Sequence, residues 1–333
     1  MELFASAPCK AILFGEHYVV YGAPALSIPI EPRNQVKFSD SQMPGIALRS
    51  ELGSAHIAPD CSFSGEPRLS LFASVAREIC GKKQVPSCTA EFLPSWGLKG
   101  VGTSASLGAA FAAGLLTLLK KKQHARKIFL AAQAGDLVAH QGKASGIDAR
   151  TVAYGLPILF QRKFAPPKFS ARSSKFTIPS GCSLLLIDTF RGKKESTAAM
   201  LANFALSFSI ATLPAATTEE KRQEVRSEFA PILKSALAAA TAQELGKAMN
   251  NNHILLRMRR VSSQEIDSAV SSALSAGAYG AKLTGGGGEG GAAIALCDSE
   301  RLRQVSSAIS ESTGFGCHPI SLAADGAKAD ASD

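Results

Sequence analysis

Short hydrophobic runs separated by glycines and polar residues mark the start of the chain and recur beyond its middle. Runs of this length, bounded by turn residues, are typical of β-strands. The strands predicted in this way comprise residues 11–14, 18–20, 25–28, 84–93, 183–187 and 292–296. The pattern near residues 151–160 predicts a further short strand or turn.

Apolar residues at helical spacing alternate with these runs. The helices predicted from this spacing comprise residues 66–82, 104–121 and 126–140, and several more between 196 and 276. The longest apolar run, Ala105–Leu119, also contains Ser106, Gly108, Gly114 and Thr117. Because a bilayer-spanning helix needs about 20 apolar residues, we expect this run to form a buried helix.

Mixed helical and strand patterns without a repeat predict an α+β fold, with helices layered on largely antiparallel sheets. A chain of 333 residues is long enough for two domains. A polar stretch begins at Pro166–Pro167, so we expect an N-terminal domain of residues 1–172 and a C-terminal domain of residues 173–326. The small, polar residues after Leu322 are expected to be frayed.

Composition excludes several classes of protein. Hydrophobic residues make up 46% of the chain and aromatic residues only 7%, so small side chains must fill much of the core and intrinsic disorder is excluded. The start, Met1–Phe4, lacks the layout of a signal peptide, which favours a cytoplasmic location. The seven cysteines are odd in number and form no Cys-x-x-Cys pair, which indicates reduced thiols rather than a zinc site or disulfides.

The formal net charge is +9, and the clearest basic cluster is residues 120–127. Such a cluster can bind nucleic acid or form a solvated junction between two helices. We favour the junction, because no aromatic residue interrupts the charges as single-stranded nucleic acid binding would require. We therefore expect neither a nucleic acid nor a membrane as partner. A positive field suits an enzyme of anionic nucleotide and carboxylate substrates.

Three segments contain candidate chemistry, and the first is Gly97–Ser106. Its glycines allow the backbone to approach a ligand closely, and a predicted helix follows directly. The free N–H groups at that helix N-terminus form an anion site. Thr103 and Ser104 offer hydroxyls for Mg²⁺ or for capping the helix. An ordinary glycine turn with a serine N-cap would produce the same pattern, and the segment is not a Walker A loop.

The second segment runs from Asp136 to Asp148. Asp136 and His140 are four residues apart, on one face of a helix, and Asp148 follows in a Ser-Gly turn. A carboxylate at Asp148 can accept a hydroxyl proton, and one at Asp136 can hold a metal. The alternative is that Ser145 and Asp148 only satisfy backbone groups of the turn.

The third segment is Ala281–Gly291, in which six of the seven positions from 285 to 291 are glycine. Ordering so many glycines costs much conformational entropy, so a structural purpose alone is a poor explanation. A flexible linker is the alternative. A buried strand is expected directly afterwards, at residues 292–296, and this favours a functional loop.

These segments resemble the GHMP kinase superfamily. Ala7–Gly22, with Gly15-Glu16-His17 at its centre, is similar to the mevalonate kinase branch in particular. Gly100–Ala105, Ser145–Asp148 and Lys282–Gly285 are similar to the superfamily's remaining motifs, in the same order along the chain. The resemblance covers residues 7–322. It implies a ribosomal-S5-like N-terminal domain and a ferredoxin-like C-terminal domain, with ATP between them.

The resemblance also implies a role for individual residues. Asp148 would be the catalytic base, with Lys10 beside it to stabilise charge on the reacting hydroxyl. Ser104 would bind Mg²⁺, and Asp136 stands where the family usually has a glutamate metal ligand. The implied ATP-binding residues are Gly97, Lys99, Gly100, Val101, Gly102, Thr103, Ser104 and Ala105.

On the substrate side, Glu16 and His17 would face mevalonate, with Tyr154 and Thr197 nearby. The implied activity is phosphorylation of the primary hydroxyl of mevalonate in isoprenoid biosynthesis, and a homodimer is common in the family. Kinases of phosphomevalonate or of a sugar-like alcohol remain alternatives, as does a non-catalytic ligand sensor on the same fold. The chain departs from the family pattern at four places, which are Cys9, Trp96–Lys99, Gln141 and Glu289.

Overall fold

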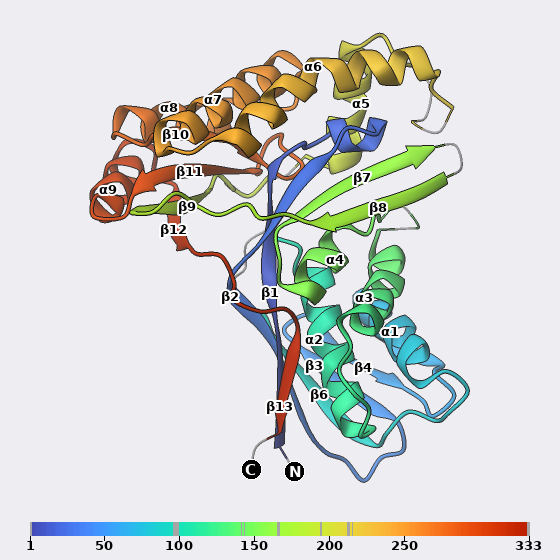
Figure 1. Ribbon diagram of the computed structural model, residues 1–333. Helices are drawn as coiled ribbons and strands as arrows, with labels where there is room; N and C mark the ends of the chain where they lie inside the picture. Colours follow the sequence, from blue (N-terminus) through green and yellow to red (C-terminus); the bar gives the residue numbers. More distant parts are fainter. Residues whose placement is uncertain are drawn as a thin grey trace.

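The protein is described by a computed structural model (Figure 1). It describes residues 2–331 apart from 96–99, 141, 143, 165–166, 194, 212–213 and 215. Two sheets with their helices form two halves, one below the other in Figure 1, and the first strands run between them. This arrangement confirms the predicted α+β class.

The first half is built on a nine-stranded sheet in the order β13-β1-β2-β6-β3-β4-β5, with the hairpin β7–β8 attached to β2. Its strands are β1 (Glu2–Phe14), β2 (Ala25–Asp40), β3 (Ile46–Ser50), β4 (Gly53–Ile57), β5 (Phe63–Gly65), β6 (Cys88–Leu93), β7 (Ile158–Phe164), β8 (Pro167–Ser173) and β13 (Lys328–Ala331). All described pairings are antiparallel except β3 with β6. The expectation of largely antiparallel sheets is therefore confirmed.

Helices pack on this sheet, and the centre of the layer is the predicted apolar helix. The helices of this half are η1 (Tyr18–Tyr21), η2 (Pro67–Leu69), α1 (Leu71–Cys80), α2 (Thr103–Leu118), α3 (Ala125–Ala139) and α4 (Ile147–Tyr154). Small residues let α2 approach the sheet closely. A Cβ atom at Gly114 would lie 2.1 Å from the ring of Phe38, so glycine is required for this packing.

The second half contains a four-stranded antiparallel sheet in the order β10-β11-β9-β12. Its elements are β9 (Cys182–Asp188), α5 (Thr197–Ser207), α6 (Glu219–Ala238), α7 (Ala242–Met258), α8 (Gln264–Ser275), β10 (Gly280–Thr284), β11 (Ala292–Asp298), α9 (Leu302–Thr313) and β12 (Gly316–Ile320). The backbones of α7 and β10 touch, because a Cβ atom at Gly280 would lie 2.3 Å from the Gly246 carbonyl oxygen.

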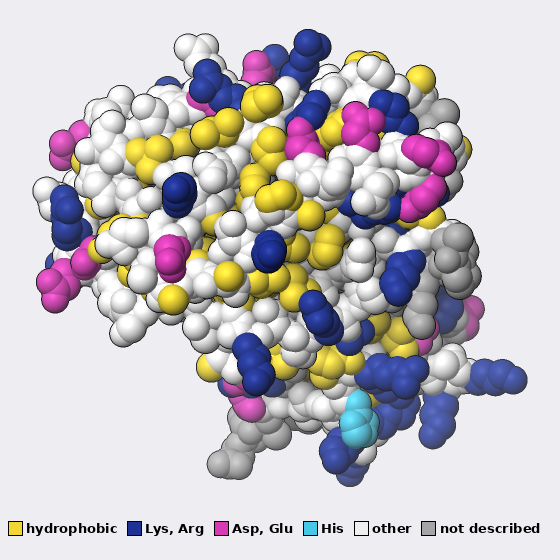
Figure 2. Space-filling model, turned by 45° about the horizontal axis from the view of Figure 1, so that its top comes forward, with side chains coloured by type: hydrophobic (Ala, Val, Ile, Leu, Met, Phe, Trp, Pro, Cys, Tyr) yellow, Lys and Arg dark blue, Asp and Glu magenta, His cyan; other side chains and the backbone are white. Residues whose placement is uncertain are grey.

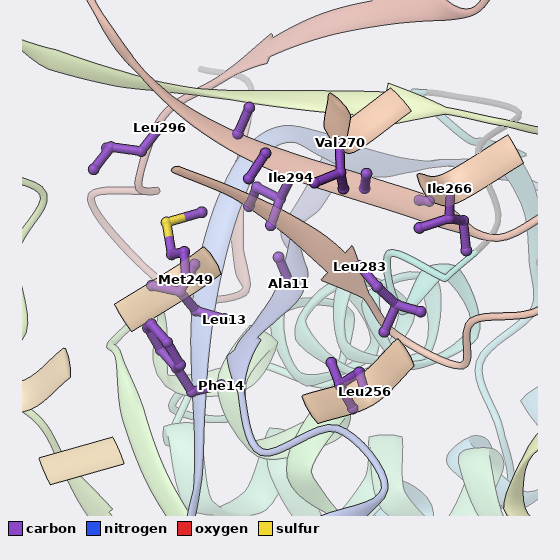
Figure 3. Close-up of a cluster of buried hydrophobic side chains, with 14 of the residues drawn as sticks. Ala11, Leu13, Phe14, Met249, Leu256, Ile266, Val270, Leu283, Ile294 and Leu296 are labelled. Atoms are coloured by element: carbon purple, nitrogen blue, oxygen red, sulfur yellow. The ribbon is translucent and has the colours of Figure 1, made fainter. Parts of the chain in front are cut away.

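The end of β1 belongs to the core of the second half. Figure 3 shows Leu13 and Phe14 beside Met249 of α7, in a cluster of buried side chains that also includes Leu256. The start of β1 instead packs with α2 and β2, in a separate cluster that includes Leu3 and Phe38. One strand thus links both cores, and the residues near its end lie between the two halves.

Several predicted elements are confirmed, including α1, α2, α3, β9, β11 and the helices between 196 and 276. The predicted strand at 18–20 is wrong, because these residues form the 3₁₀ helix η1. The predicted strand or turn near 151–160 is correct only from Ile158, where β7 begins; residues 151–154 end helix α4.

The expected fraying of the C-terminus is also wrong. Residues 328–331 form β13, which pairs antiparallel with Leu3–Ser6 of β1. Figure 1 shows both chain ends at the same edge of the first sheet. The predicted domain boundary at residue 172 falls at the end of strand β8, which pairs with β7 along its length.

The surface shows where the charges and exposed apolar side chains lie. Basic side chains are concentrated in the lower right of Figure 2, and apolar side chains are scattered over its upper part. The basic residues 120–127 span the connection from α2 to α3, as expected for a helix junction. Within the described part of the chain, no helix is both long and apolar enough to cross a membrane.

Candidate active site

Lys10 and Asp148 meet where the first sheet faces the start of α2. Lys10 lies in β1, and Asp148 lies in the first turn of α4. The Lys10 Nζ atom is 3.2 Å from Asp148 Oδ1 and donates to the carbonyl oxygen of Gly100, also at 3.2 Å. The Lys10 side chain is 5% exposed and that of Asp148 is 24% exposed. The pair is thus held in place but open to a ligand on the carboxylate side.

Opposing effects act on the pKa of Asp148. Burial disfavours the charged carboxylate and raises this pKa above its ordinary value, whereas the nearby Lys10 ammonium lowers it. Burial is the larger effect, so Asp148 is a stronger base than an exposed aspartate. A carboxylate with a raised pKa beside an ammonium suits proton acceptance from an alcohol.

The phosphate-binding candidates form the turn that begins α2. Gly100 and Gly102 have φ angles of 90° and 74°, in the left-handed region, and Gly102 is the N-cap of the helix. The backbone N–H of Lys10 donates to Val101 O at 2.9 Å, which ties this turn to β1. The first N–H groups of α2, from Thr103 onward, therefore lie beside the Lys10–Asp148 pair.

Two predicted ATP-binding residues, Gly97 and Lys99, lie outside the described residues. Gln141, the extra residue of the family comparison, lies outside them as well. Ala105 is described and is fully buried.

Ser104 and Asp136 form the predicted metal-binding pair. The Ser104 hydroxyl donates to Asp136 Oδ1 at 2.8 Å, and the His140 Nε2 atom is 3.3 Å from the same oxygen. This hydrogen bond to Asp136 raises the pKa of His140. Asp136 is buried, at 3% exposed, so its contacts hold it close to the start of α2.

The donor atoms of this pair fit a hard divalent cation, which prefers carboxylate and hydroxyl oxygens. Among the described residues, however, no group of three or more His, Cys, Asp or Glu side chains is placed to hold a metal ion. A cation at Ser104 and Asp136 would therefore take its other ligands from phosphate oxygens and water. This is the usual situation for Mg²⁺ bound with a nucleotide.

A sharp turn after β1 carries Glu16 and His17. Gly15 and His17 both adopt left-handed φ angles, of 98° and 60°. The Glu16 carboxylate forms a fully buried ion pair with Lys282 of β10. The His17 ring stacks on Phe204 of α5, with centroids 5.6 Å apart. Burial lowers the pKa of His17 to about 4, so the imidazole is neutral at physiological pH.

The glycine-rich loop between β10 and β11 closes the site from the other half. A Cβ atom at Gly286 would lie 2.8 Å from Thr197 Oγ1, so loop and side chain are in direct contact. A backbone group of Gly286 also lies near the His17 ring. The structure thus brings Thr197 and His17 to the same loop. The Glu195 N–H donates to the Glu289 carbonyl oxygen at 2.9 Å, and the Glu289 N–H donates to Glu195 Oε2 at 2.8 Å. These two hydrogen bonds anchor the far end of the loop.

Tyr154 is the predicted residue that the structure does not bring to this group. It ends α4, at the opposite end from Asp148, and its ring lies 4.8 Å from the guanidinium of Arg150. Among the described residues, no hydrogen bond or ring contact joins Tyr154 to Glu16 or His17.

Sequence reasoning assigned no role to Lys282, Phe204 or His140. Lys282 was visible as part of the third motif, and its buried apolar neighbours were a signal that its charge needs a partner. Phe204 lies in an apolar helix without any distinguishing pattern. The spacing from Asp136 to His140 indicated a shared helix face, but not that both contact one oxygen.

Together these groups can move a phosphoryl group. The N-terminus of α2 and Lys10 present positive charge, Asp148 presents a base, and Glu16 and His17 present polar atoms for a small alcohol. A narrow gap beside Lys10 is bordered by Gly100 from one half and by Leu186 and Thr284 from the other. The Lys10–Asp148 pair therefore lies where the two halves face each other.

Comparison with known proteins adds three findings. Residues 233–313 match the family model described as GHMP kinases C terminal. The chain is 30% identical over 333 residues to the mevalonate kinase of Aeropyrum pernix, with 97% of each protein covered, and 29% identical to that of Thermococcus gammatolerans, with 94% of each covered. It also resembles the crystal structure of L. major mevalonate kinase in complex with R-mevalonate, at 24% identity, with 96% of each chain covered and a TM-score of 0.77.

Proposed function

This chain belongs to the mevalonate kinase family, and we propose that its site transfers the γ-phosphoryl group of ATP to the primary hydroxyl of mevalonate. The fold is that of the GHMP kinases, as the sequence motifs predicted. The observation that supports the reaction most directly is the Lys10–Asp148 ion pair at the start of α2. It combines a base, a cation and an anion site in one place.

Asp148 acts as the general base in this proposal. Its carboxylate accepts the proton of the primary hydroxyl as the hydroxyl oxygen attacks the γ-phosphorus. The bond from the γ-phosphorus to the β–γ bridging oxygen breaks, and ADP leaves with that electron pair. A well-placed base contributes about 10²–10⁴-fold to such a step. Lys10, 3.2 Å from the carboxylate, stabilises the negative charge on the attacking oxygen.

The backbone of the turn at Gly100–Thr103 and the N-terminus of α2 bind the ATP phosphates, because their N–H groups and the helix dipole favour anions. Ser104 and Asp136 would hold the divalent cation, which we propose to be Mg²⁺. When bound, this cation neutralises phosphate charge.

Glu16, His17 and Thr197 bind mevalonate. Their polar atoms lie at the turn after β1 and beside Gly286 of the glycine-rich loop. Of the proposed substrate residues, Tyr154 has the least support, because it lies at the far end of α4 from Asp148.

An assay that couples ADP release to NADH oxidation tests the function. The purified chain is given ATP with mevalonate, phosphomevalonate or homoserine in parallel. We expect turnover with mevalonate and at least tenfold lower kcat/KM with the other two, which is about 1.4 kcal/mol of discrimination. Preference for another alcohol would assign the chain to a different GHMP kinase activity, and no turnover with any of the three would favour a ligand sensor.

A further inference from the structure

The ion pair between Glu16 and Lys282 crosses from one half of the molecule to the other. Both side chains are 0% exposed. The Lys282 Nζ atom donates to Glu16 Oε1 and to the carbonyl oxygen of Leu283. Its ammonium also lies 5.9 Å from the centre of the Phe14 ring. A buried ion pair contributes little net stability compared with a well-packed apolar pair, so stability alone is a poor explanation for this one.

The polar groups beside the pair are incomplete. Glu16 Oε2 is buried and has no hydrogen-bond partner among the described residues. Neither ring nitrogen of His17 makes a hydrogen bond of normal geometry within that part of the chain. Buried polar atoms left without partners cost free energy. Two adjacent side chains in this state indicate a site that a polar ligand completes.

Lys282 is fixed by its own strand rather than by Glu16. Strand β10 touches α7 through Gly246 and Gly280, and the Ala281 N–H donates to Asn250 Oδ1 at 2.9 Å. The turn that carries Glu16 is held less directly, by the left-handed residues Gly15 and His17. A rigid strand therefore positions the ammonium, and the ammonium positions the carboxylate.

We propose that Lys282 is a positioning residue for the alcohol substrate, acting through Glu16. By binding Oε1, it turns Oε2 toward the substrate and favours the charged form of the carboxylate, so that Oε2 accepts a hydrogen bond from a substrate hydroxyl. This inference rests on the proposed function, because it takes Glu16 as a substrate-binding residue. Consistent with it, burial raises the pKa of Glu16 and the Lys282 ammonium opposes that rise.

Lys282→Met tests the proposal, because methionine keeps the length and removes the charge. We expect the KM for mevalonate to rise by about tenfold or more, as for a weakened hydrogen bond to a charged group. The KM for ATP should stay within about twofold, since the nucleotide side is not touched. Asn250→Ala is the matched control: it loosens β10 one residue away without removing the partner of Glu16. It should leave both constants within about twofold.

A second pair of variants keeps the test decisive if Lys282→Met does not fold. Glu16→Gln together with Lys282→Met leaves no unpaired buried charge, and it is compared with Glu16→Gln alone. Equal KM values for mevalonate support the proposal, because Lys282 then acts only through Glu16. A further rise in the double variant, or a normal KM in Lys282→Met, overturns it.

A measurement without substrate separates this inference from the proposed function. Amide hydrogen exchange of residues 15–21 reports how firmly the turn is held. Exchange there should be about tenfold faster in Lys282→Met than in the wild type and unchanged in Asn250→Ala. Equal exchange in all three proteins overturns the positioning role, whatever alcohol the wild type phosphorylates. A wild type without kinase activity refutes the function instead.

Discussion

In the proposed function, the Lys10–Asp148 contact places the base and the stabilising cation side by side. Asp148 begins α4 and Lys10 lies in the middle of β1, so two rigid elements set their 3.2 Å separation. Phosphoryl transfer depends mainly on such positioning and on charge stabilisation. The neutral His17 and the ion-paired Glu16 show how burial and a partner prepare neighbouring groups for different tasks.

Asp148→Asn should lower kcat by about 10²–10⁴-fold, because asparagine keeps the shape and removes the proton acceptor. The KM for ATP should change little, since the start of α2 is untouched. Rapid-quench or coupled kinetics beside a thermal melt decide the outcome. A variant with normal stability and near-normal kcat would contradict the role of base.

His17 should make folding stability depend on pH. Its pKa in the folded protein is about 4, below the ordinary value of 6.5. The unfolded chain therefore binds a proton as the pH falls below 6.5, while the folded chain does not. Stability from this residue is complete above pH 6.5 and falls by about 2 kcal/mol on going from pH 7.5 to pH 5.

Urea unfolding at the two pH values measures this loss in the wild type, in His17→Asn and in the control His124→Asn, whose histidine is exposed. His17→Asn should lose about 2 kcal/mol less than the wild type on acidification, and His124→Asn should lose as much as the wild type. His253, whose pKa is also about 4, keeps its share of the loss in all three proteins. Equal losses in all three would show that His17 is not the cause.

At the scale of elements, the site is built from places where chain segments end. Helix α2 begins at Thr103, after its N-cap Gly102; α4 begins beside Asp148, and β1 ends two residues before Glu16. Element ends leave backbone groups unpaired and allow tight turns. Strand β10 ends at the glycine-rich loop, where Gly286 lies against Thr197 at the start of α5.

Gly102→Ala tests the turn at the start of α2. The residue has a left-handed φ of 74°, and an added Cβ atom would lie 2.9 Å from Lys10 Cγ. Displacing Lys10 by a fraction of an ångström should lower kcat by about 10–100-fold. Gly181→Ala is the matched control, because its φ of 75° is also left-handed, its Cβ atom would meet nothing within 4 Å, and it lies before β9, outside the candidate site.

Both alanine variants should lose about 1 kcal/mol of stability, from the strained backbone. Only Gly102→Ala should show the large loss in kcat, measured at saturating ATP and mevalonate. If the two variants lost equal activity, backbone strain rather than the position of Lys10 would be the cause.

At the scale of the whole molecule, β1 contributes to the cores of both halves, and the first and last strands pair in the first sheet. The end of β1 packs in the core of the second half, and β13 returns from the second half to pair with the start of β1. Tyr18 of η1 donates to Glu228 of α6 at 2.6 Å, which adds a contact between the halves. The division at residue 172 and the homodimer stay predictions.

Truncation after Ala323 should destabilise the protein through the first sheet. It removes β13, which pairs with four residues of β1, and the contacts of Asp325 with Arg33. Losing a few backbone hydrogen bonds of about 1 kcal/mol each predicts a loss of roughly 2–4 kcal/mol. Calorimetry compares the chain truncated after Ala323 with one truncated after Ala331, which keeps the strand. Equal melting temperatures would show that β13 contributes nothing.

The sequence by itself determined most of the local elements and the residues that we propose to react. Helical spacing predicted α1, α2 and α3, and the motifs around Lys10, Ser104 and Asp148 named the groups that the structure brings to the start of α2. These predictions succeed because spacing and glycine content act within a few residues of chain.

The tertiary structure alone decided what depends on distant partners. The apolar run at 18–20 forms a 3₁₀ helix because Tyr18 packs between Phe204 and Phe229 of the second half. The polar residues 328–331 form a strand because β1 has a free edge to pair with. Lys282 finds Glu16 across 266 positions of sequence. No local pattern specifies such a contact, since burial next to an opposite charge exists only once both sheets have formed.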